Sequence, residues 1–533
     1  MSTTQEPGSD TAKVEIDPAA FERRWKILAV LCTSLMVVIV GNTALNVALP
    51  TLARELNASI SAQQWMVDAY GLVFAGLLLT AGTIGDRFGR KGTLQAGLTV
   101  FLAGSVFAAF SHTASAIIVG RAVMGVGAAF VMPATLSILT NVFPPHERGK
   151  AIAVWAGISG GGAAVGPVAS GFLLEHFSWG SVFLVNVPII AIALVAGYIL
   201  LPKSRDPHPG ALDPIGALLS IAGLGSLVYA IIEAPNRGWA SSTSLVWFGV
   251  AAVVIASFLA WELRNTAPML NLRYFLDPRF GVAAGVITLV FFGMFGFFFL
   301  LTQYFQLVLG YGTLEAGVKQ LPFAAVMMLI APNSPRFAAR FGANVAVAVG
   351  LVGMSSGMFL FTIAHTNTPY IQIVLVVMLM AAGMAICIPT MTGSIMSAVP
   401  LGKAGVGSAM NDTTRELGGA LGVAVLGSLV ASRYDARLSP ALDLLPGSLK
   451  GQASESLAGA LRAGSEVGGS TGGQVVSIAR EAFVSGMHLA AVIAGCVALL
   501  AAAIVYRKLP SGNPHATGAA SLSRQPAGLL ADH

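Results

Sequence analysis

The chain has 533 residues, of which 55% are hydrophobic and only 10% charged, and its mean hydropathy is +0.77. Soluble proteins carry roughly 25% charged residues, so a soluble domain surrounded by water is excluded. The net charge of +6 does not indicate a nucleic-acid partner, because the basic residues cluster in short turns between apolar runs. Cys32, Cys387 and Cys496 lie in apolar runs and form neither a metal-binding spacing nor a disulfide framework.

Long apolar runs recur from Leu28 to Val505, and each can cross a bilayer core of about 30 Å as a helix. The first run is too long for a signal peptide and lacks a cleavage site, so we interpret it as a span. The sequence therefore predicts an all-α integral membrane protein. We expect fourteen spans, near 27–49, 63–83, 93–111, 114–138, 149–173, 181–201, 213–232, 244–262, 281–309, 316–338, 344–364, 370–394, 406–430 and 484–506.

Lysine and arginine alternate strongly between successive turns. The basic set comprises Arg23, Arg24, Lys26, Arg87, Arg90, Lys91, Arg148, Lys150, Lys203, Arg205, Arg264, Arg273, Arg279, Arg336, Arg340, Lys403, Arg507 and Lys508. The other short turns hold little beyond Arg54, Arg237 and Lys319. The positive-inside rule predicts that the basic turns and both termini face the cytoplasm.

The ends of the chain, 1–20 and 509–533, are polar and are predicted to be disordered tails in the cytoplasm. Residues 431–483 form the one long predicted loop, on the extracellular side. Within it, Leu449, Leu457 and Leu461 fall near one helical face. This spacing predicts a short amphipathic helix on the outer mouth, and a solvated linker fits equally well.

The turn between spans 2 and 3 carries more than a topology signal, because it follows the pattern G-x-x-x-D-R-x-G-R-K. Its residues are Gly82, Asp86, Arg87, Gly89, Arg90 and Lys91. The pattern resembles the signature turn of the major facilitator superfamily. The resemblance implies that the Asp caps and pairs across to the other helical bundle and closes an inner gate. The glycines permit a tight turn, and a purely topological turn is the alternative.

Span 5 reads GISGGGAAVGPVASG. Gly162, Gly166, Pro167 and Gly171 resemble the G-x-x-x-G-P-x-x-G-G motif of proton-coupled exporters in this superfamily, with Ser170 in place of a glycine. The resemblance implies a leak-proof hinge at the interface between bundles. Ordinary packing of small residues between helices is the alternative.

Fourteen spans resemble the drug:proton antiporter branch typified by quaternary-ammonium-compound resistance pumps. That resemblance implies two six-helix bundles, with two inserted helices between them, at 21–202, 203–270 and 271–508. The segment SPRFAARFG of the second bundle resembles the charged turn but lacks its Asp, and it contains Arg336, Arg340 and Gly342. The family also implies a monomer, with protons as the coupling ion and no other cofactor.

Proton coupling needs a titratable group within the spans, where ionisable side chains are costly and mark function. At 1.5 Å per residue, Asp68 and Arg121 lie about 9 and 10 Å deep from the same side. Their equal depth makes a pair possible. We hypothesise that Asp68 releases its proton when Arg121 is near and binds one when they separate. A static structural ion pair is the alternative.

Span 13 contains NDTTRELGG, in which Asp412 and Glu416 share a helix face and Arg415 is one turn from Asp412. Two acids this close need not both ionise, which suits a cation site or a second proton site. Capping or gating at a helix N-terminus is the alternative. Family members often have Asp in span 1 at the place of Gly41, and neither Gly41 nor Asn42 can titrate.

We expect the substrate to contact polar and aromatic side chains of spans 1, 2 and 13, because aromatic faces bind cations. The candidates are Asn42, Asn46, Trp65, Tyr70 and Asp412. Packing against lipid or neighbouring helices is the alternative for the aromatic residues.

The chain lacks the G-x-x-x-x-G-K-[ST] phosphate loop, and we find neither a nucleophile with its base nor a metal cluster, so no enzyme activity is expected. We interpret the chain as a proton-driven exporter of amphipathic, cationic drugs in the bacterial inner membrane. Two alternatives remain: an exporter of a native metabolite, antibiotic, lipid or siderophore, and a receptor or scaffold that has lost transport.

Overall fold

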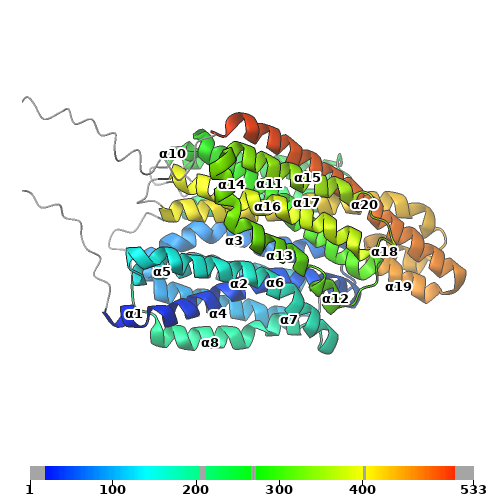
Figure 1. Ribbon diagram of the computed structural model, residues 1–533. Helices are drawn as coiled ribbons and strands as arrows, with labels where there is room; N and C mark the ends of the chain where they lie inside the picture. The colour runs from blue at the N-terminus through cyan, green and yellow to red at the C-terminus, as the bar shows by residue number, and fades with distance from the viewer. Residues whose placement is uncertain (1–17, 205–211, 266–267, 269–271, 400–403, 511–533) are drawn as a thin grey trace, which may run out of the picture.

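The computed structural model describes residues 18–204, 212–265, 268, 272–399 and 404–510, except for a few side chains within its helices. All elements of these ranges are helical, which confirms the predicted all-α fold (Figure 1). The first bundle comprises α1 (Pro18–Glu22), α2 (Arg24–Glu55), α3 (Ile60–Phe88), α4 (Arg90–Ala109), α5 (Ala114–Val142), α6 (Pro145–His176), α7 (Ser181–Leu184) and α8 (Asn186–Leu200). Two inserted helices follow, α9 (Pro214–Arg237) and α10 (Ser242–Arg264).

The second bundle begins with a 3₁₀ turn, Leu272–Leu276, and α11 (Pro278–Gln303), which continues as a π-helical turn, Tyr304–Val308. The next membrane-length segment of this bundle consists of α12 (Thr313–Val318), α13 (Leu321–Ile330), a 3₁₀ turn (Ala331–Asn333) and α14 (Ser334–Phe341). The remaining helices are α15 (Ala343–Phe361), α16 (Tyr370–Ala398), α17 (Ala404–Leu442), α18 (Gly447–Glu455), α19 (Leu457–Val467) and α20 (Gly469–Lys508).

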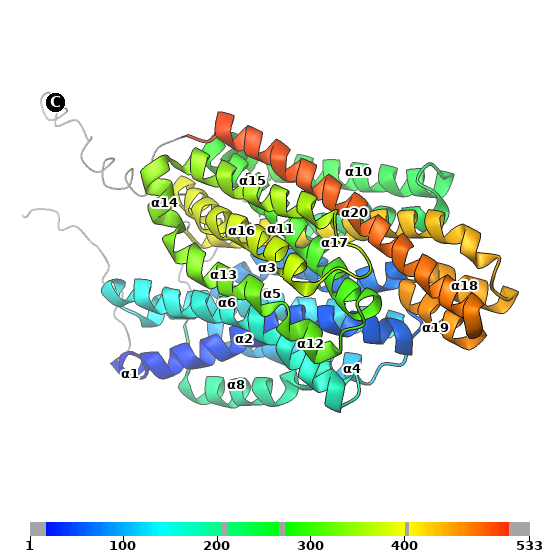
Figure 2. The same ribbon diagram turned by 45° about the vertical axis from the view of Figure 1, so that its right-hand side comes forward.

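Twelve helical segments of the described ranges are long and apolar enough to cross a membrane. The helices α3 and α6 are not among them, although their 29 and 32 residues extend about 44 and 48 Å at 1.5 Å per residue. The predicted count of fourteen spans therefore stays a prediction. The helix α1 and the C-terminal end of α20 lie at the same end of the molecule. The helices α18 and α19 lie at the opposite end (Figures 1 and 2).

The two bundles meet along α3 and α17 and along α6 and α12, and α9 packs against both α3 and α17. The contact of α9 depends on Pro235, which has no N–H to donate to the carbonyl of Ile231 one turn earlier. That carbonyl accepts a hydrogen bond from Ser428 Oγ of α17 (2.9 Å). On the other side, Ser61 Oγ of α3 donates to the carbonyl of Ile232 (3.3 Å). The inserted helix is thus bonded to both bundles.

Two buried glutamines cross the bundle interface near the α18 end of the molecule. Gln64 of α3 donates to the carbonyl of Ala424 of α17 (2.9 Å), and Gln306 of the π-helical turn donates to that of Val47 of α2 (2.8 Å). Within the described residues, the side-chain carbonyl of each glutamine has no hydrogen-bond partner. The two bundles are therefore joined here by donors that reach into the opposite backbone.

The charged turn after α3 and the similar turn after α14 in the second bundle share one backbone conformation. Gly89 joins α3 to α4 with φ +114°, and Gly342 joins α14 to α15 with φ +89°. Side chains other than hydrogen disfavour this region, so both turns require glycine. The second bundle therefore keeps the conformation of the turn although it lacks the Asp.

The predicted long loop at 431–483 is mostly helical. The helix α17 continues to Leu442, α20 already begins at Gly469, and α18 and α19 connect them. Leu457 is buried where α19 packs against α20, whereas Leu449 lies on the separate helix α18. The solvated-linker alternative is wrong, and the predicted ends of these two spans were too short, because periodicity marks only the apolar part of a longer helix.

Close contact between α4 and α5 depends on glycines that face each other. A Cβ atom at Gly127 would lie 2.6 Å from the carbonyl oxygen of Gly97 and 2.7 Å from Cβ of Phe101. Glycine is therefore needed for the two backbones to approach.

We expect Gly127→Ala to destabilise the protein by about 1–3 kcal/mol, because the added methyl group must push α4 away from α5. The matched control is Gly225→Ala on α9, where an added Cβ meets nothing within 4 Å. The control should leave stability unchanged or raise it by up to about 1 kcal/mol. Thermal unfolding in detergent measures both, and equal melting temperatures would contradict the packing argument.

Candidate functional site

A fully buried arginine connects three helices of the first bundle. Arg121 of α5 is 0% exposed. Its Nε donates to the carbonyl of Met66 (2.9 Å), its Nη1 to that of Gly41 (2.9 Å), and its Nη2 to Oδ1 of Asn42 (3.3 Å). The guanidinium carbon also lies 4.3 Å from the centre of the Tyr70 ring. Backbone oxygens and an aromatic face, rather than a carboxylate, therefore surround this cation.

At position 41, where the family resemblance implies an acid, the structure leaves little space for a side chain. A Cβ atom at Gly41 would lie 2.7 Å from Cζ of Phe101. An Asp here would require the Phe101 ring to move. The carbonyl of Gly41 instead accepts a hydrogen bond from Arg121.

Asp68 lies within α3 and is 1% exposed. Within the described residues, neither of its carboxylate oxygens has a hydrogen-bond partner. The Arg121 guanidinium bonds instead to Met66, half a turn earlier on the same helix. In this conformation no described hydrogen bond joins Asp68 to Arg121. The predicted exchange between paired and separate states stays a prediction.

Glu416 of α17 approaches the same region from the second bundle. A Cβ atom at Gly71 of α3 would lie 3.5 Å from Glu416 Oε2, and Gly71 is one turn after Asp68. The charge of Glu416 also acts on Arg121 and on Tyr70. The bundle interface therefore places Glu416 of the second bundle beside α3, one turn from Asp68.

Asp412 lies one turn before Glu416, more than two turns after α17 begins at Ala404. A role in capping the helix N-terminus is therefore not supported. Asp412 Oδ1 is 3.4 Å from Arg415 Nη1, and the Arg415 guanidinium carbon lies 4.7 Å from the centre of the Phe291 ring of α11. The sequence spacing predicted that Arg415 and Asp412 lie near each other, but it held no signal for Phe291, which is distant in the chain.

The predicted substrate residues do not converge on one surface. Tyr70 is buried beside Arg121, and its hydroxyl donates to the carbonyl of Val38 (3.3 Å). Trp65 packs toward the inserted helix, with its ring centre 6.2 Å from that of Tyr229 of α9. Asn42 bonds to Arg121, and Asn46 is half-buried one turn later on α2. Packing, the alternative for the aromatic residues, describes Trp65 and Tyr70 in this conformation.

The charged turn contacts the end of α8 within its own bundle. Lys91 Nζ donates to the carbonyls of Tyr198 (2.7 Å) and Leu201 (2.9 Å), and the backbone N–H of Arg90 donates to that of Ser204 (3.0 Å). These contacts fix the turn against the chain that leaves the first bundle.

The other turn residues contribute less to the described contacts. Arg87 is exposed beside the ring of Phe88, and Gly82 faces Pro133 at an ordinary van der Waals distance. The side chain of Asp86 lies outside the described part of the structure. Its predicted pairing with the other bundle therefore stays a prediction.

The glycines of span 5 lie where α6 meets two other helices. A Cβ at Gly171 would lie 2.6 Å from Cα of Leu314 of α12, and one at Gly166 would lie 3.2 Å from the backbone N of Ala44 of α2.

The same helix also contacts α12 through Pro167. A Cβ atom at Gly317 of α12 would lie 2.5 Å from the carbonyl oxygen of Pro167. Gly162 falls outside the described side chains. The described part of this motif thus includes close backbone contacts between the two bundles.

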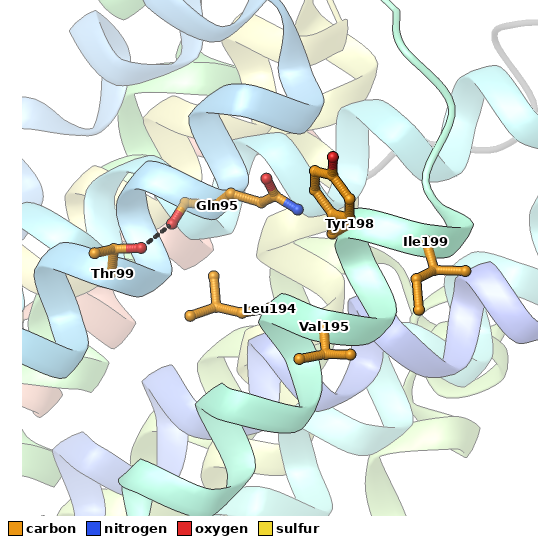
Figure 3. A pocket seen from close by; sticks show the side chains of 6 residues that line it. All are labelled: Gln95, Thr99, Leu194, Val195, Tyr198 and Ile199. Atoms are coloured by element: carbon orange, nitrogen blue, oxygen red, sulfur yellow. Dashed lines mark hydrogen bonds between the residues drawn. The ribbon is translucent and has the colours of Figure 1, made fainter.

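One groove lies away from these residues (Figure 3). It has a volume of about 360 Å³ and runs between α4 and α8 of the first bundle. Tyr198, which lines it, is 74% exposed, and none of the predicted site residues lines the groove. The groove therefore lies on an outer face of the first bundle, apart from the bundle interface.

Comparisons with known proteins agree with this architecture. Residues 31–423 match the family model of the Major Facilitator Superfamily. The chain is 36% identical to the multidrug efflux pump LfrA of Mycolicibacterium smegmatis, over 91% of this chain and 96% of that protein.

Two other relatives are resistance proteins. The chain is 33% identical to the methyl viologen resistance protein SmvA of Salmonella typhimurium, over 90% of this chain and 97% of that protein. It is 32% identical to the tetracenomycin C resistance and export protein of Streptomyces glaucescens, over 90% and 91% respectively.

A bacterial homologue of the human lysosomal transporter Spinster, solved in an inward-facing and unoccupied conformation, superposes with a TM-score of 0.65. It is 17% identical, over 92% of this chain and 98% of that one. These findings agree with the absence of enzyme chemistry expected from the sequence, because the matched family is one of transporters. The chain therefore belongs to the major facilitator superfamily, among relatives that are multidrug and antibiotic resistance efflux pumps.

Proposed function

We propose that this chain is a proton-coupled exporter of amphipathic, cationic compounds, acting by alternating access as a monomer in the bacterial inner membrane with both termini in the cytoplasm. The observation that carries the proposal is Asp68, a carboxyl group that is 1% exposed and has no hydrogen-bond partner among the described residues. An ionised carboxylate without a partner is costly in such surroundings, so the group can lose its charge only by binding a proton. A transporter needs such a group to exchange protons between two states.

The proposed coupling uses Arg121 as the partner that two acids share. In this conformation Arg121 bonds to backbone carbonyls, Asp68 is unpaired, and Glu416 approaches from the second bundle. When the bundles rock, α3 and α17 move relative to each other, so the distance from Arg121 to Glu416 changes. Asp68 and Arg121 lie in the same bundle, and their distance changes only when α3 moves relative to α5. Asp68 releases its proton when the guanidinium or water reaches it and binds one when it is enclosed again.

The relatives support the cationic substrate class. One is named a multidrug efflux pump and another a methyl viologen resistance protein, and methyl viologen is an aromatic cation. Export of a native antibiotic is the second candidate, which the tetracenomycin C relative favours. A receptor or scaffold without transport is less well supported, because the glycines at the bundle interface keep the close contacts that moving bundles need.

We expect purified protein in proteoliposomes to release protons when tetraphenylphosphonium is added, and Asp68→Asn to abolish this release while the melting temperature is kept. The asparagine cannot titrate but has nearly the same size. A pH-sensitive dye measures the release. The matched control, Asp443→Asn, changes an acid that is 87% exposed and should release protons as the unmodified protein does. Release that persists in Asp68→Asn would exclude the coupling role.

We further expect at least two protons per exported monovalent cation. With one proton the exchange moves no net charge and uses only the pH gradient, about 1.4 kcal/mol per unit. A second proton adds the electrical term, about 2.3 kcal/mol per 100 mV. Export of tetraphenylphosphonium should therefore rise with a potassium-diffusion potential at constant pH. Export that ignores the potential would indicate a single proton.

A further inference from the structure

Asp412 and Phe291 together form a place whose chemistry suits an organic cation, and a cation of the chain itself fills it. The Arg415 guanidinium carbon lies 4.7 Å from the centre of the Phe291 ring, and Nη1 of Arg415 is 3.4 Å from Oδ1 of Asp412. An aromatic face beside a carboxylate is the combination that binds ammonium and other organic cations. We call Asp412 and Phe291 the cation site.

The two members of the cation site are fixed independently of Arg415. Phe291 is 4% exposed and packs beside Phe295, with ring centres 6.0 Å apart. Asp412 Oδ1 also accepts from Nδ2 of Asn411 (3.4 Å), whose own Oδ1 accepts from the hydroxyl of Thr392 on α16 (3.1 Å). The site should therefore keep its shape when Arg415 leaves it.

Arg415 is the loosely bound member. Its side chain is 38% exposed, whereas that of Asp412 is 14% exposed, and one hydrogen bond joins it to Asp412. Arg121, by contrast, is fully buried and makes three bonds of 3.3 Å or less. Half-exposed ion pairs contribute little, so Arg415 can exchange its place for solvent at small cost.

The cation site also lies beside the proposed coupling residues. Glu416 is one turn from Asp412 on α17, and it approaches Gly71 of α3 across the bundle interface. A cation bound to Asp412 would thus lie near the place where the two bundles move past each other.

We propose that Arg415 is a tethered cation that occupies the cation site in the empty transporter, and that an exported organic monocation enters by displacing it. This inference rests on the proposed function and names the site at which its substrate binds. The exchange keeps Asp412 paired throughout, because Arg415 returns when the substrate leaves. A carboxylate left unpaired at the interface would oppose the return of the empty carrier.

A purely structural role for Arg415 makes the opposite prediction. If the arginine only orients Asp412, its removal should weaken cation binding. If it competes with the substrate, its removal should strengthen binding. The sign of the change therefore separates the two roles.

The experiment measures equilibrium binding of tetraphenylphosphonium to the purified full-length chain in detergent. We expect Arg415→Gln to bind about three- to tenfold more tightly than the unmodified chain, because a weak intramolecular competitor is gone. Asp412→Asn should weaken binding, and the double variant should lose the gain. The matched control is Arg433→Gln, which changes another arginine of α17 whose described contact is with Ser485 and should not change binding.

A second measurement tests whether the vacated place accepts a guanidinium ion. Methylguanidinium should displace tetraphenylphosphonium from Arg415→Ala at lower concentrations than from the unmodified chain. Arg415→Lys, which keeps the charge, should bind nearly as the unmodified chain does and guards against a folding defect in the other variants. If Arg415 had only a structural role, methylguanidinium would not displace tetraphenylphosphonium from Arg415→Ala at lower concentrations than from the unmodified chain.

Unchanged or weaker binding in Arg415→Gln, or no binding in any variant, would overturn the cation site and leave proton-coupled export to its own test. Conversely, tighter binding in Arg415→Gln without proton release by the unmodified protein would retain the cation site and overturn the proposed coupling.

Discussion

The candidate site depends on how the positive charge of a guanidinium buried away from water is stabilised. Arg121 is enclosed among α2, α3 and α5, and the carbonyls of Gly41 and Met66 take the place of a counter-ion. Because backbone oxygens satisfy the guanidinium, no acid is needed beside it in this conformation. In the proposed movement of the bundles, Glu416 of the second bundle can therefore change its distance to this cation. In the proposed mechanism, a permanent ion pair would hold Asp68 in its ionised form.

Hydrogen bonds across the bundle interface hold the two bundles together around Arg121. Gln64 and Gln306 donate across the interface toward the α18 end, and α9 is bonded to both bundles through serines. In the proposed rocking of the bundles, these hydrogen bonds are exchanged for hydrogen bonds with water. The unpartnered side-chain carbonyls of both glutamines would gain hydrogen bonds from that water, which offsets part of the loss.

Much of the fold could be predicted from the sequence, because apolar length and basic turns are local signals. The span segments, the tight turn at Gly89 and the burial of Asp68 follow from such signals. A short helix within 431–483 was predicted from its leucines, but the continuation of α17 to Leu442 and the early start of α20 at Gly469 were not, since small residues there carry weak periodicity. Phe291 and the direction of the Arg121 guanidinium also escaped prediction, because both depend on contacts between helices far apart in the chain.

The close packing at Gly41 has an evolutionary consequence. The Phe101 ring lies where a side chain at 41 would begin, so the two positions form an epistatic pair. An acid introduced at 41 would therefore require the Phe101 ring to move or residue 101 to become smaller. The side chains that position 41 of α2 can hold therefore depend on the residue at position 101 of α4.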